Sequence, residues 1–164
     1  MKLSRICEYI SKRVDSSSLT VENYISTENM MQNKGGVVSA SKVPSEKAVE
    51  FQPGDILISN IRPYFKKIWL ADKKGGCSSD VLCIRASSGT DSTYLYYLLS
   101  QDAFFDYVMT GAKGSKMPRG DKSQIMQWEA DIPSIEEQHR IARTLKSFDD
   151  KIALNTRINH NLAV

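Results

Sequence analysis

Pro53-Gly-Asp-Ile-Leu-Ile-Ser-Asn-Ile-Arg-Pro-Tyr-Phe-Lys-Lys-Ile-Trp-Leu-Ala71 is the stretch of sequence that decides the fold. Its first two residues, Pro-Gly, predict a turn, and the apolar runs at 55–59 and 67–71 predict two short buried strands. A third run, 80–85, follows soon after. Short apolar runs that alternate with turn residues are typical of a sheet built mostly from antiparallel strands.

Helical patterns flank these strands on both sides. Apolar residues recur at helical spacing over 3–14, which predicts an amphipathic helix at the start of the chain. Residues 94–99 and 103–109 predict two helical segments that pack against the sheet, with Asp91 or Ser92 as the N-cap of the first.

The remaining segments are less regular. Residues 20–25 predict a short strand or a turn, the polar residues 27–46 a long loop, and residues 123–130 a last strand. Together these elements predict an α+β domain over residues 1–132, with a twisted, mostly antiparallel sheet and flanking helices.

The C-terminal segment, 133–164, predicts one long helix. Ser134-Ile-Glu-Glu137 has the pattern of a capping box, in which a serine side chain and a glutamate side chain bond the first free amides of a helix. A coiled-coil-like seam then follows at heptad spacing. Its predicted interface residues are Ile141, Leu145, Phe148, Ile152, Asn155 and Asn159. A helix that packs against its own domain would show the same spacing, so a partner chain and the chain's own domain both remain candidates.

Composition places the chain among ordinary globular proteins. It has 164 residues, of which 41% are hydrophobic and 25% charged. No apolar run is long enough to cross a bilayer and the N-terminus lacks a signal-peptide pattern, so we expect a cytoplasmic protein with no membrane partner. The three cysteines lack metal-site spacing, so we expect reduced, partly buried thiols and no metal.

Charge is unevenly distributed along the chain. Segment 59–74 carries five basic residues against one acid, a net charge of +4, and segment 111–122 carries four against one, a net charge of +3. Since the whole chain sums to +3, the rest of it is acidic, at −4. Such an asymmetry indicates a surface for a polyanion, although two solvated charge runs would give the same count.

The residue types in both segments suit duplex DNA. Asn60 and Arg62 belong to the side chains that read adenine and guanine edges, and lysines suit phosphate contacts, which position the protein without reading sequence. Glycines and Pro118 keep the second segment irregular and able to approach a backbone closely. The predicted DNA-binding residues are Asn60, Arg62, Tyr64, Lys66, Lys67, Lys113, Ser115, Lys116, Arg119 and Lys122.

No pattern predicts catalysis. The paired carboxylates 136–137 and 149–150 are adjacent in a predicted helix, so their members point in different directions. No nucleophile elbow and no glycine-rich nucleotide loop occurs in the sequence. We therefore expect no catalytic site and no cofactor.

The chain resembles one family over nearly its whole length. Segments 53–71, 76–82 and 95–99 are similar to a target recognition domain of the specificity (S) subunit of type I restriction–modification systems. Ile132-Pro-Ser-Ile-Glu-Glu-Gln-His-Arg-Ile-Ala142 resembles the point where that family passes into its central helix, and 149–159 resembles the helix itself.

The resemblance implies that DNA recognition, methylation and cleavage are carried out by different subunits. S subunits carry no catalytic site and typically hold two recognition domains apart on antiparallel helices, each reading half of a bipartite DNA target. Methyltransferase (M) subunits dock on the helices and methylate adenine using S-adenosylmethionine, and restriction (R) subunits join to cleave unmodified DNA. This sequence resembles half an S subunit, with residues 133–164 for dimerisation and M docking.

Several roles follow from that resemblance. Two half-subunits would pair around a two-fold axis as a homodimer. The alternatives are a stand-alone DNA-binding regulator, an adaptor whose helix docks a partner while the basic segments are merely solvated, and a truncated recombination-stock fragment without activity of its own.

Overall fold

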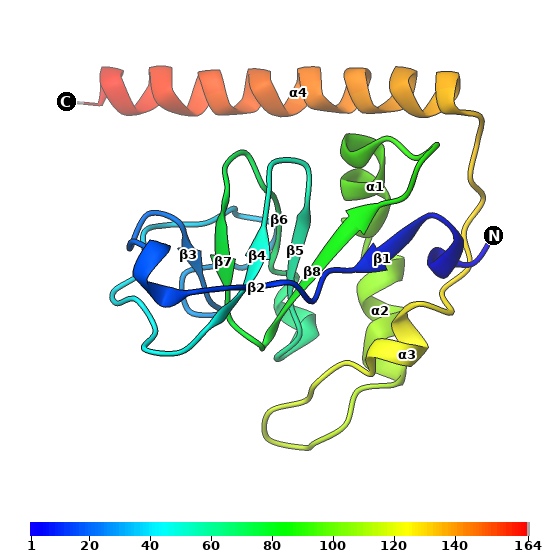
Figure 1. Cartoon of the computed structure of the whole chain (residues 1–164). Helices are drawn as coiled ribbons and strands as arrows, with labels where there is room; N and C mark the ends of the chain where they lie inside the picture. The colour runs from blue at the N-terminus through cyan, green and yellow to red at the C-terminus, as the bar shows by residue number, and fades with distance from the viewer. Residues whose placement is uncertain (164) are drawn as a thin grey trace.

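The predicted strand at 55–59 is central to the fold. In the structure, a computed structural model that describes residues 1–163, β5 (Ile56–Ser59) pairs antiparallel with β6 (Ile68–Leu70) and with β8 (Val81–Ala86). On the far side of β8, β1 (Cys7–Tyr9) completes a four-stranded antiparallel sheet (Figure 1). The three predicted strands of this sheet are thus confirmed.

A second four-stranded sheet lies beside the first. Its order is β2 (Arg13–Val14), β4 (Ala48–Phe51), β7 (Gly75–Cys77) and β3 (Tyr24–Ile25), and only the pair β3–β7 is parallel. These strands have two to four residues each, which is too short to give a clear alternation of apolar and polar residues in the sequence.

One strand separates two hydrophobic cores. Successive side chains of a strand point to opposite faces, so Ile56 and Ile58 of β5 join one cluster, while Leu57 joins the other. The first cluster includes Phe104 and Leu95 from the helices, and the second forms around residues of both sheets.

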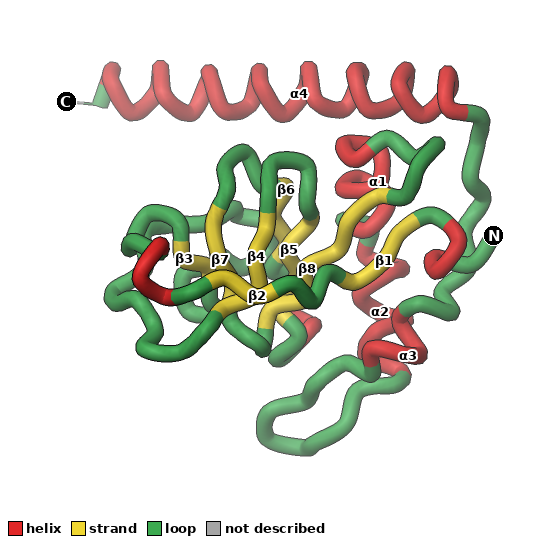
Figure 2. Tube along the Cα trace, in the orientation of Figure 1, coloured by secondary structure: helices red, strands yellow, loops and turns green. Residues whose placement is uncertain are grey.

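Besides α4 (Ile135–Leu162), three helices contribute buried side chains to the first core, and Figure 2 shows where these helices lie. They are α1 (Ser92–Leu99), α2 (Asp102–Thr110) and the short α3 (Lys122–Ile125). The Asp91 side chain caps α1 by accepting a hydrogen bond of 2.7 Å from the Tyr94 amide. Both predicted helical segments and one of the two candidate N-caps are therefore confirmed.

The helix predicted over 3–14 is wrong. This segment forms a single 3-10 turn, η1 (Leu3–Arg5), followed by β1 and β2. Residues 7–9 pair with the edge of β8, and this pairing satisfies their backbone N–H and C=O groups. A short helix that packs little against the rest of the protein is only marginally stable, so the strand is favoured. Leu3, Ile6 and Cys7 are still buried, but in the geometry of a turn and a strand.

The strand predicted over 123–130 is also wrong. The chain forms α3 instead, because the Asp121 side chain accepts hydrogen bonds from the amides of Ser123 and Gln124 and so starts a helix. Past α3 the chain returns to the N-terminus, where the Leu3 amide bonds the Trp128 carbonyl at 2.8 Å.

The long C-terminal helix is confirmed as α4 (Ile135–Leu162). The Ser134 hydroxyl accepts from the Glu137 amide at 3.4 Å, which is one half of the predicted capping box, whereas the Glu137 carboxylate accepts from Arg140. No helix within residues 1–163 is both long and apolar enough to cross a membrane.

The N-terminal half of α4 packs against the body, chiefly on α1. The Gln138 side chain accepts from the Asp91 amide at 3.0 Å, and the Tyr97 hydroxyl donates to Asp149 at 2.7 Å. In Figure 1, α4 runs along one side of the molecule, and the loop between α2 and α3 projects from the opposite side.

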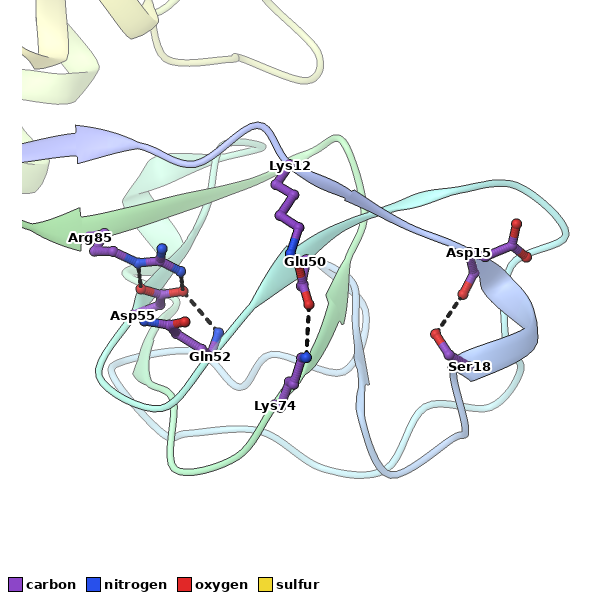
Figure 3. A network of polar contacts seen from close by, with 8 residues as sticks. All are labelled: Lys12, Asp15, Ser18, Glu50, Gln52, Asp55, Lys74 and Arg85. Carbon is purple, nitrogen blue, oxygen red and sulfur yellow. Dashed lines mark hydrogen bonds and ion pairs between the residues drawn. The ribbon is translucent and has the colours of Figure 1, made fainter.

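Buried charge in the sheets is paired. Asp55 is 1% exposed at its side chain and accepts two hydrogen bonds from Arg85, at 2.7 and 2.8 Å (Figure 3). Glu50 of β4 lies between Lys12 and Lys74, which belong to segments far apart in the sequence. These contacts fix the sheets from which the surface loops extend.

Candidate nucleic-acid interface

The connection from β5 to β6 is a tight turn with unusual backbone. After β5 the chain forms one 3-10 turn, η3 (Pro63–Phe65), and the residues on either side of it, Arg62 and Lys66, have φ of 49° and 52°. Left-handed backbone at residues with a side chain costs on the order of 1–2 kcal/mol each. Such strain is often held at functional sites, so the turn is a candidate binding element.

The second cationic segment docks directly onto this turn. The Arg62 amide donates to the Pro118 carbonyl at 2.8 Å, and Ile61 and Arg119 form an antiparallel bridge. Within the segment, Lys113 and Arg119 also pair, so residues 113–119 form a narrow hairpin. Two segments separated by about fifty residues in the sequence thus form one continuous surface.

A third segment joins the same place, and the charge pattern gave no sign of it. Asn33 and Lys34 also have left-handed backbone, with φ of 54° and 61°. Their amides donate to the carbonyls of Phe65 and Lys66, each at 2.8 Å. The local signal in the sequence is the run Gln32-Asn-Lys-Gly-Gly36, because asparagine and glycine favour turns that need positive φ.

We call the surface made by these three segments the basic surface. It comprises Lys34, Arg62, Tyr64, Lys66, Lys67, Lys113, Ser115, Lys116 and Arg119. Acidic side chains partly neutralise it, since Arg119 pairs with Asp80 at 3.2 Å and Lys113 with Asp121 at 3.2 Å.

Crowding of positive charge affects Lys67. Its pKa is lowered, first by partial burial and then by the charge of Arg62. The Lys67 ammonium donates to the Thr27 carbonyl at 2.6 Å. Lys67 therefore faces both the basic surface and the neighbouring loop, and Arg62 lies near enough to raise the local positive potential.

The predicted DNA-binding residues differ in exposure. Tyr64 is 46% exposed, and Lys113, Ser115, Lys116 and Arg119 are exposed on the hairpin. The other three basic residues of the turn, Arg62, Lys66 and Lys67, are half-buried. Among residues 1–163 the structure shows no ion pair for Arg62 or Lys116, so both charges are available to a ligand.

Asn60 lies at the base of the hairpin, where it is largely buried. It is 9% exposed, and its side-chain amide donates to the Gly120 carbonyl at 3.1 Å while the Gly120 amide donates to the Asn60 carbonyl. A Cβ on Gly120 would lie 2.8 Å from Asn60 Oδ1, so the glycine permits this close contact. Asn60 holds the base of the hairpin and does not face outward to read bases.

Lys122 also lies apart from the hairpin. As the first residue of α3 it accepts a hydrogen bond from the Tyr9 hydroxyl at its carbonyl, and its side chain lines a recess together with Tyr9 and Arg13. The structure therefore brings together eight of the ten predicted residues and places two outside the basic surface.

A cleft of about 380 Å³ borders the basic surface. It meets the surface at Thr27, which accepts from Lys67, and at Asp80, which pairs with Arg119. Five of its thirteen lining residues are serine or threonine, Glu28 is a second acid, and Lys42 is a base. Hydroxyl and carboxylate oxygens are the groups that accept hydrogen bonds from exocyclic amino groups of bases.

The exposed face of α4 is a second candidate interface. Phe148 is 59% exposed and Ile152 is 63% exposed, and the apolar area is wider than the predicted seam because Leu154 and Ile158 are exposed too. Asn155 and Asn159 are exposed along the seam, and Leu145 is exposed at its start. Ile141, by contrast, packs against the first core.

Within residues 1–163 there is no group of three or more side chains that could hold a metal ion. The three cysteines are buried and unpaired, and burial raises the pKa of the Cys7 thiol to about 12. A thiol with so high a pKa stays protonated at neutral pH and is a poor nucleophile.

Fold and surface together define a class: an α+β domain with one basic surface and one long helix that has exposed apolar side chains. The family comparison is specific. The model of the type I restriction modification DNA specificity domain matches residues 1–163, and the chain belongs to this family.

Curated relatives agree with this assignment. The chain is 28% identical over 115 residues to the EcoDI specificity subunit of Escherichia coli, covering 70% of this chain and 26% of the relative. It is 25% identical to the HindI specificity subunit of Haemophilus influenzae, covering 98% of this chain and 37% of that protein. It is 31% identical to the MjaIX specificity subunit of Methanocaldococcus jannaschii, covering 72% of this chain and 28% of that protein. The chain thus spans about a quarter to a third of the length of these relatives, all of which are named specificity subunits of type I restriction enzymes.

Solved structures show the same fold. The HsdS subunit from Thermoanaerobacter tengcongensis matches 96% of this chain and 43% of its own length, with a TM-score of 0.72 at 21% identity. The S subunit from M. genitalium matches 93% of this chain and 39% of its own length, with a TM-score of 0.64 at 18% identity.

Proposed function

We propose that residues 1–132 of this chain bind duplex DNA through the basic surface and read one half of a bipartite target for a type I restriction–modification complex. The observation that carries the proposal is the pairing of Arg62 with Pro118, which joins two cationic segments into one surface. Family membership supports it, because the matching family is that of a DNA specificity domain.

The roles within this surface follow from side-chain chemistry. Arg62 and Arg119 have guanidinium groups that can bond a guanine edge at two points, whereas Lys113, Lys116 and Ser115 on the hairpin suit phosphate oxygens. Tyr64 offers an exposed ring and hydroxyl. The cleft beyond Asp80 offers the carboxylates of Glu28 and Asp80 as acceptors to the amino groups of adenine or cytosine.

The helix α4, in segment 133–164, has a separate role in the proposal. Its exposed apolar face docks a methyltransferase subunit, and through that complex a restriction subunit, or pairs with the same helix of a second copy. The support is the exposed area around Phe148 and Ile152, because contiguous exposed apolar surface marks interaction sites. One solved neighbour belongs to a study of complex assembly in the type I system.

Salt dependence of duplex binding tests the DNA proposal. The basic surface holds seven basic residues against the three acids that pair with them, so the logarithm of the binding constant should fall with the logarithm of salt concentration with a slope of about −3 to −4. Titration of a mixed-sequence duplex by fluorescence anisotropy measures the slope. A slope near zero would leave the basic segments as solvated charge and favour the adaptor role.

A further inference from the structure

Three segments of the chain meet at one carboxylate oxygen. Lys34 Nζ lies 3.1 Å and Lys66 Nζ 3.0 Å from Oδ1 of Asp102, the first residue of α2. The Asp102 side chain is 63% exposed, whereas the two lysine side chains are 34% and 28% exposed. The two lysine side chains are therefore more covered than the acid, whose side chain is largely open to solvent.

The backbone is strained in order to hold the two lysines together. Both have left-handed backbone, with φ of 61° at Lys34 and 52° at Lys66, and the amide of one donates to the carbonyl of the other. Positive φ is unfavourable at a residue with a side chain, and so is the approach of two like charges. An exposed ion pair offsets little of this, so stability does not explain why the two lysines converge.

An anion does explain the convergence. Two ammonium groups on a single oxygen are the arrangement that a phosphate oxygen takes from lysines, and the free amides at the start of α2 also favour negative charge there. The pKa of Asp102 is lowered by its hydrogen bond from Lys66 first and then by that from Lys34, so the carboxylate is charged at neutral pH. Asp102 thus presents a permanent anion at the position that suits a phosphate.

We propose that Lys34 and Lys66 form a phosphate-binding site on the basic surface, and that Asp102 occupies this site in the free protein until a backbone phosphate of duplex DNA displaces its carboxylate. The inference rests on the proposed DNA binding and adds to it a site and an internal competitor. The competitor weakens binding to every duplex by the same factor, so it lowers the affinity for DNA in general and leaves the ratio of affinities between duplexes unchanged.

Replacement of one acid by its amide tests the competitor. Asp102→Asn should raise the affinity of the full chain for a mixed-sequence duplex about three- to tenfold at low salt, and should steepen the salt slope by about one, because a phosphate then meets lysines that no carboxylate has neutralised. Asp106→Asn is the matched control. Asp106 is exposed one turn further along α2 and has no ion pair within residues 1–163. Its replacement by asparagine therefore changes the net charge by the same amount as Asp102→Asn but frees no lysine.

The lysines are tested in the same assay. Lys34→Ala added to Asp102→Asn should cancel most of the gain in affinity and return the slope toward that of the unaltered chain. Asp102→Ser should raise the affinity for duplex DNA as Asp102→Asn does. Two variants are used so that a folding defect in one of them does not hide the effect. Thermal melting of each variant separates loss of structure from loss of binding.

The outcomes are distinguishable from those of the parent proposal. If the unaltered chain binds duplex with a steep slope but Asp102→Asn matches Asp106→Asn or binds more weakly, the competitor is refuted while DNA binding stands. If the unaltered chain does not bind duplex at all, both proposals fall. An increase in affinity confined to Asp102 variants and dependent on Lys34 supports the inference.

Discussion

Single side chains on the basic surface divide into two roles that mutation can separate. Arg62 has no described ion pair and lies where turn and hairpin meet, whereas Lys116 is exposed on the hairpin. A guanidinium can bond a base edge at two points, and an ammonium on a flexible stem behaves as a point charge. The difference predicts different consequences for sequence preference.

Arg62→Ala should weaken binding to a preferred target by about 1–3 kcal/mol and weaken binding to unrelated duplexes much less. Arg62→Lys keeps the charge but loses the two-point bond, so it should lose the preference too. Selection of bound duplexes from a randomised pool, followed by affinity measurements on the winner and on a shuffled duplex, gives both values. Equal losses on the two duplexes would assign Arg62 to the phosphates.

Lys116→Ala is the complementary variant. It should lower affinity for all duplexes alike and reduce the magnitude of the salt slope by about one. The same two duplexes and a salt series provide the measurement. A loss confined to the selected duplex would instead give Lys116 a part in base reading.

At the level of elements, helix α4 was predictable and the N-terminal segment was not. Ser134 and the heptad spacing after it both indicate one long helix, and the structure has that helix from 135 to 162. The helical spacing over 3–14 was equally regular, but the edge of β8 draws Cys7–Tyr9 into a strand. Periodicity reports which residues are buried, and only tertiary contacts decide how they are buried.

The sequence predicted part of the basic surface, and the rest depends on tertiary contacts. Two of its segments have an excess of positive charge that can be counted in the sequence. Their contact, the hydrogen bond from the Arg62 amide to the Pro118 carbonyl, is known only from the structure. The third segment, Asn33–Lys34, carries only one charge and depends on backbone conformation, which composition does not express. Asn60 was predicted from its residue type, because asparagine suits base reading. In the structure its side chain instead bonds the Gly120 carbonyl at the base of the hairpin.

The exposed face of α4 leads to a prediction at the same level. Ile152→Asp should abolish co-purification with the partner of the helix while changing the free energy of unfolding by less than about 0.5 kcal/mol, because the side chain is already exposed. Ala153→Asp is the control, because it adds the same charge at the next exposed residue, on a different side of the helix. Co-expression with a methyltransferase subunit and with a second, differently tagged copy of the chain identifies the partner.

If Ile152→Asp leaves both associations intact, the exposed apolar face is not the docking surface. If Ala153→Asp also disrupts them, charge on the helix rather than the apolar stripe is responsible. Urea unfolding of the variants, followed by circular dichroism, checks that the helix and the domain remain folded.

For the molecule as a whole, β5 links the two hydrophobic cores. Ile56 and Ile58 fill one core while Leu57 fills the other, so neither core persists once this strand is lost. We therefore expect residues 1–132 to unfold in a single cooperative transition, with the calorimetric enthalpy equal to the van't Hoff enthalpy. Two separate transitions would show that the two sheets fold independently.

The opposite placement of α4 and the hairpin has a consequence for how such a chain can change over generations (Figure 1). Within residues 1–163, no described hydrogen bond or ion pair joins α4 to segments 33–34, 60–67 or 111–121. Substitutions on one side therefore leave the contacts of the other side in place. The loops are free to diversify among lineages while the helix keeps whatever companion it has, and the helix can adapt to a new companion without altering the loops.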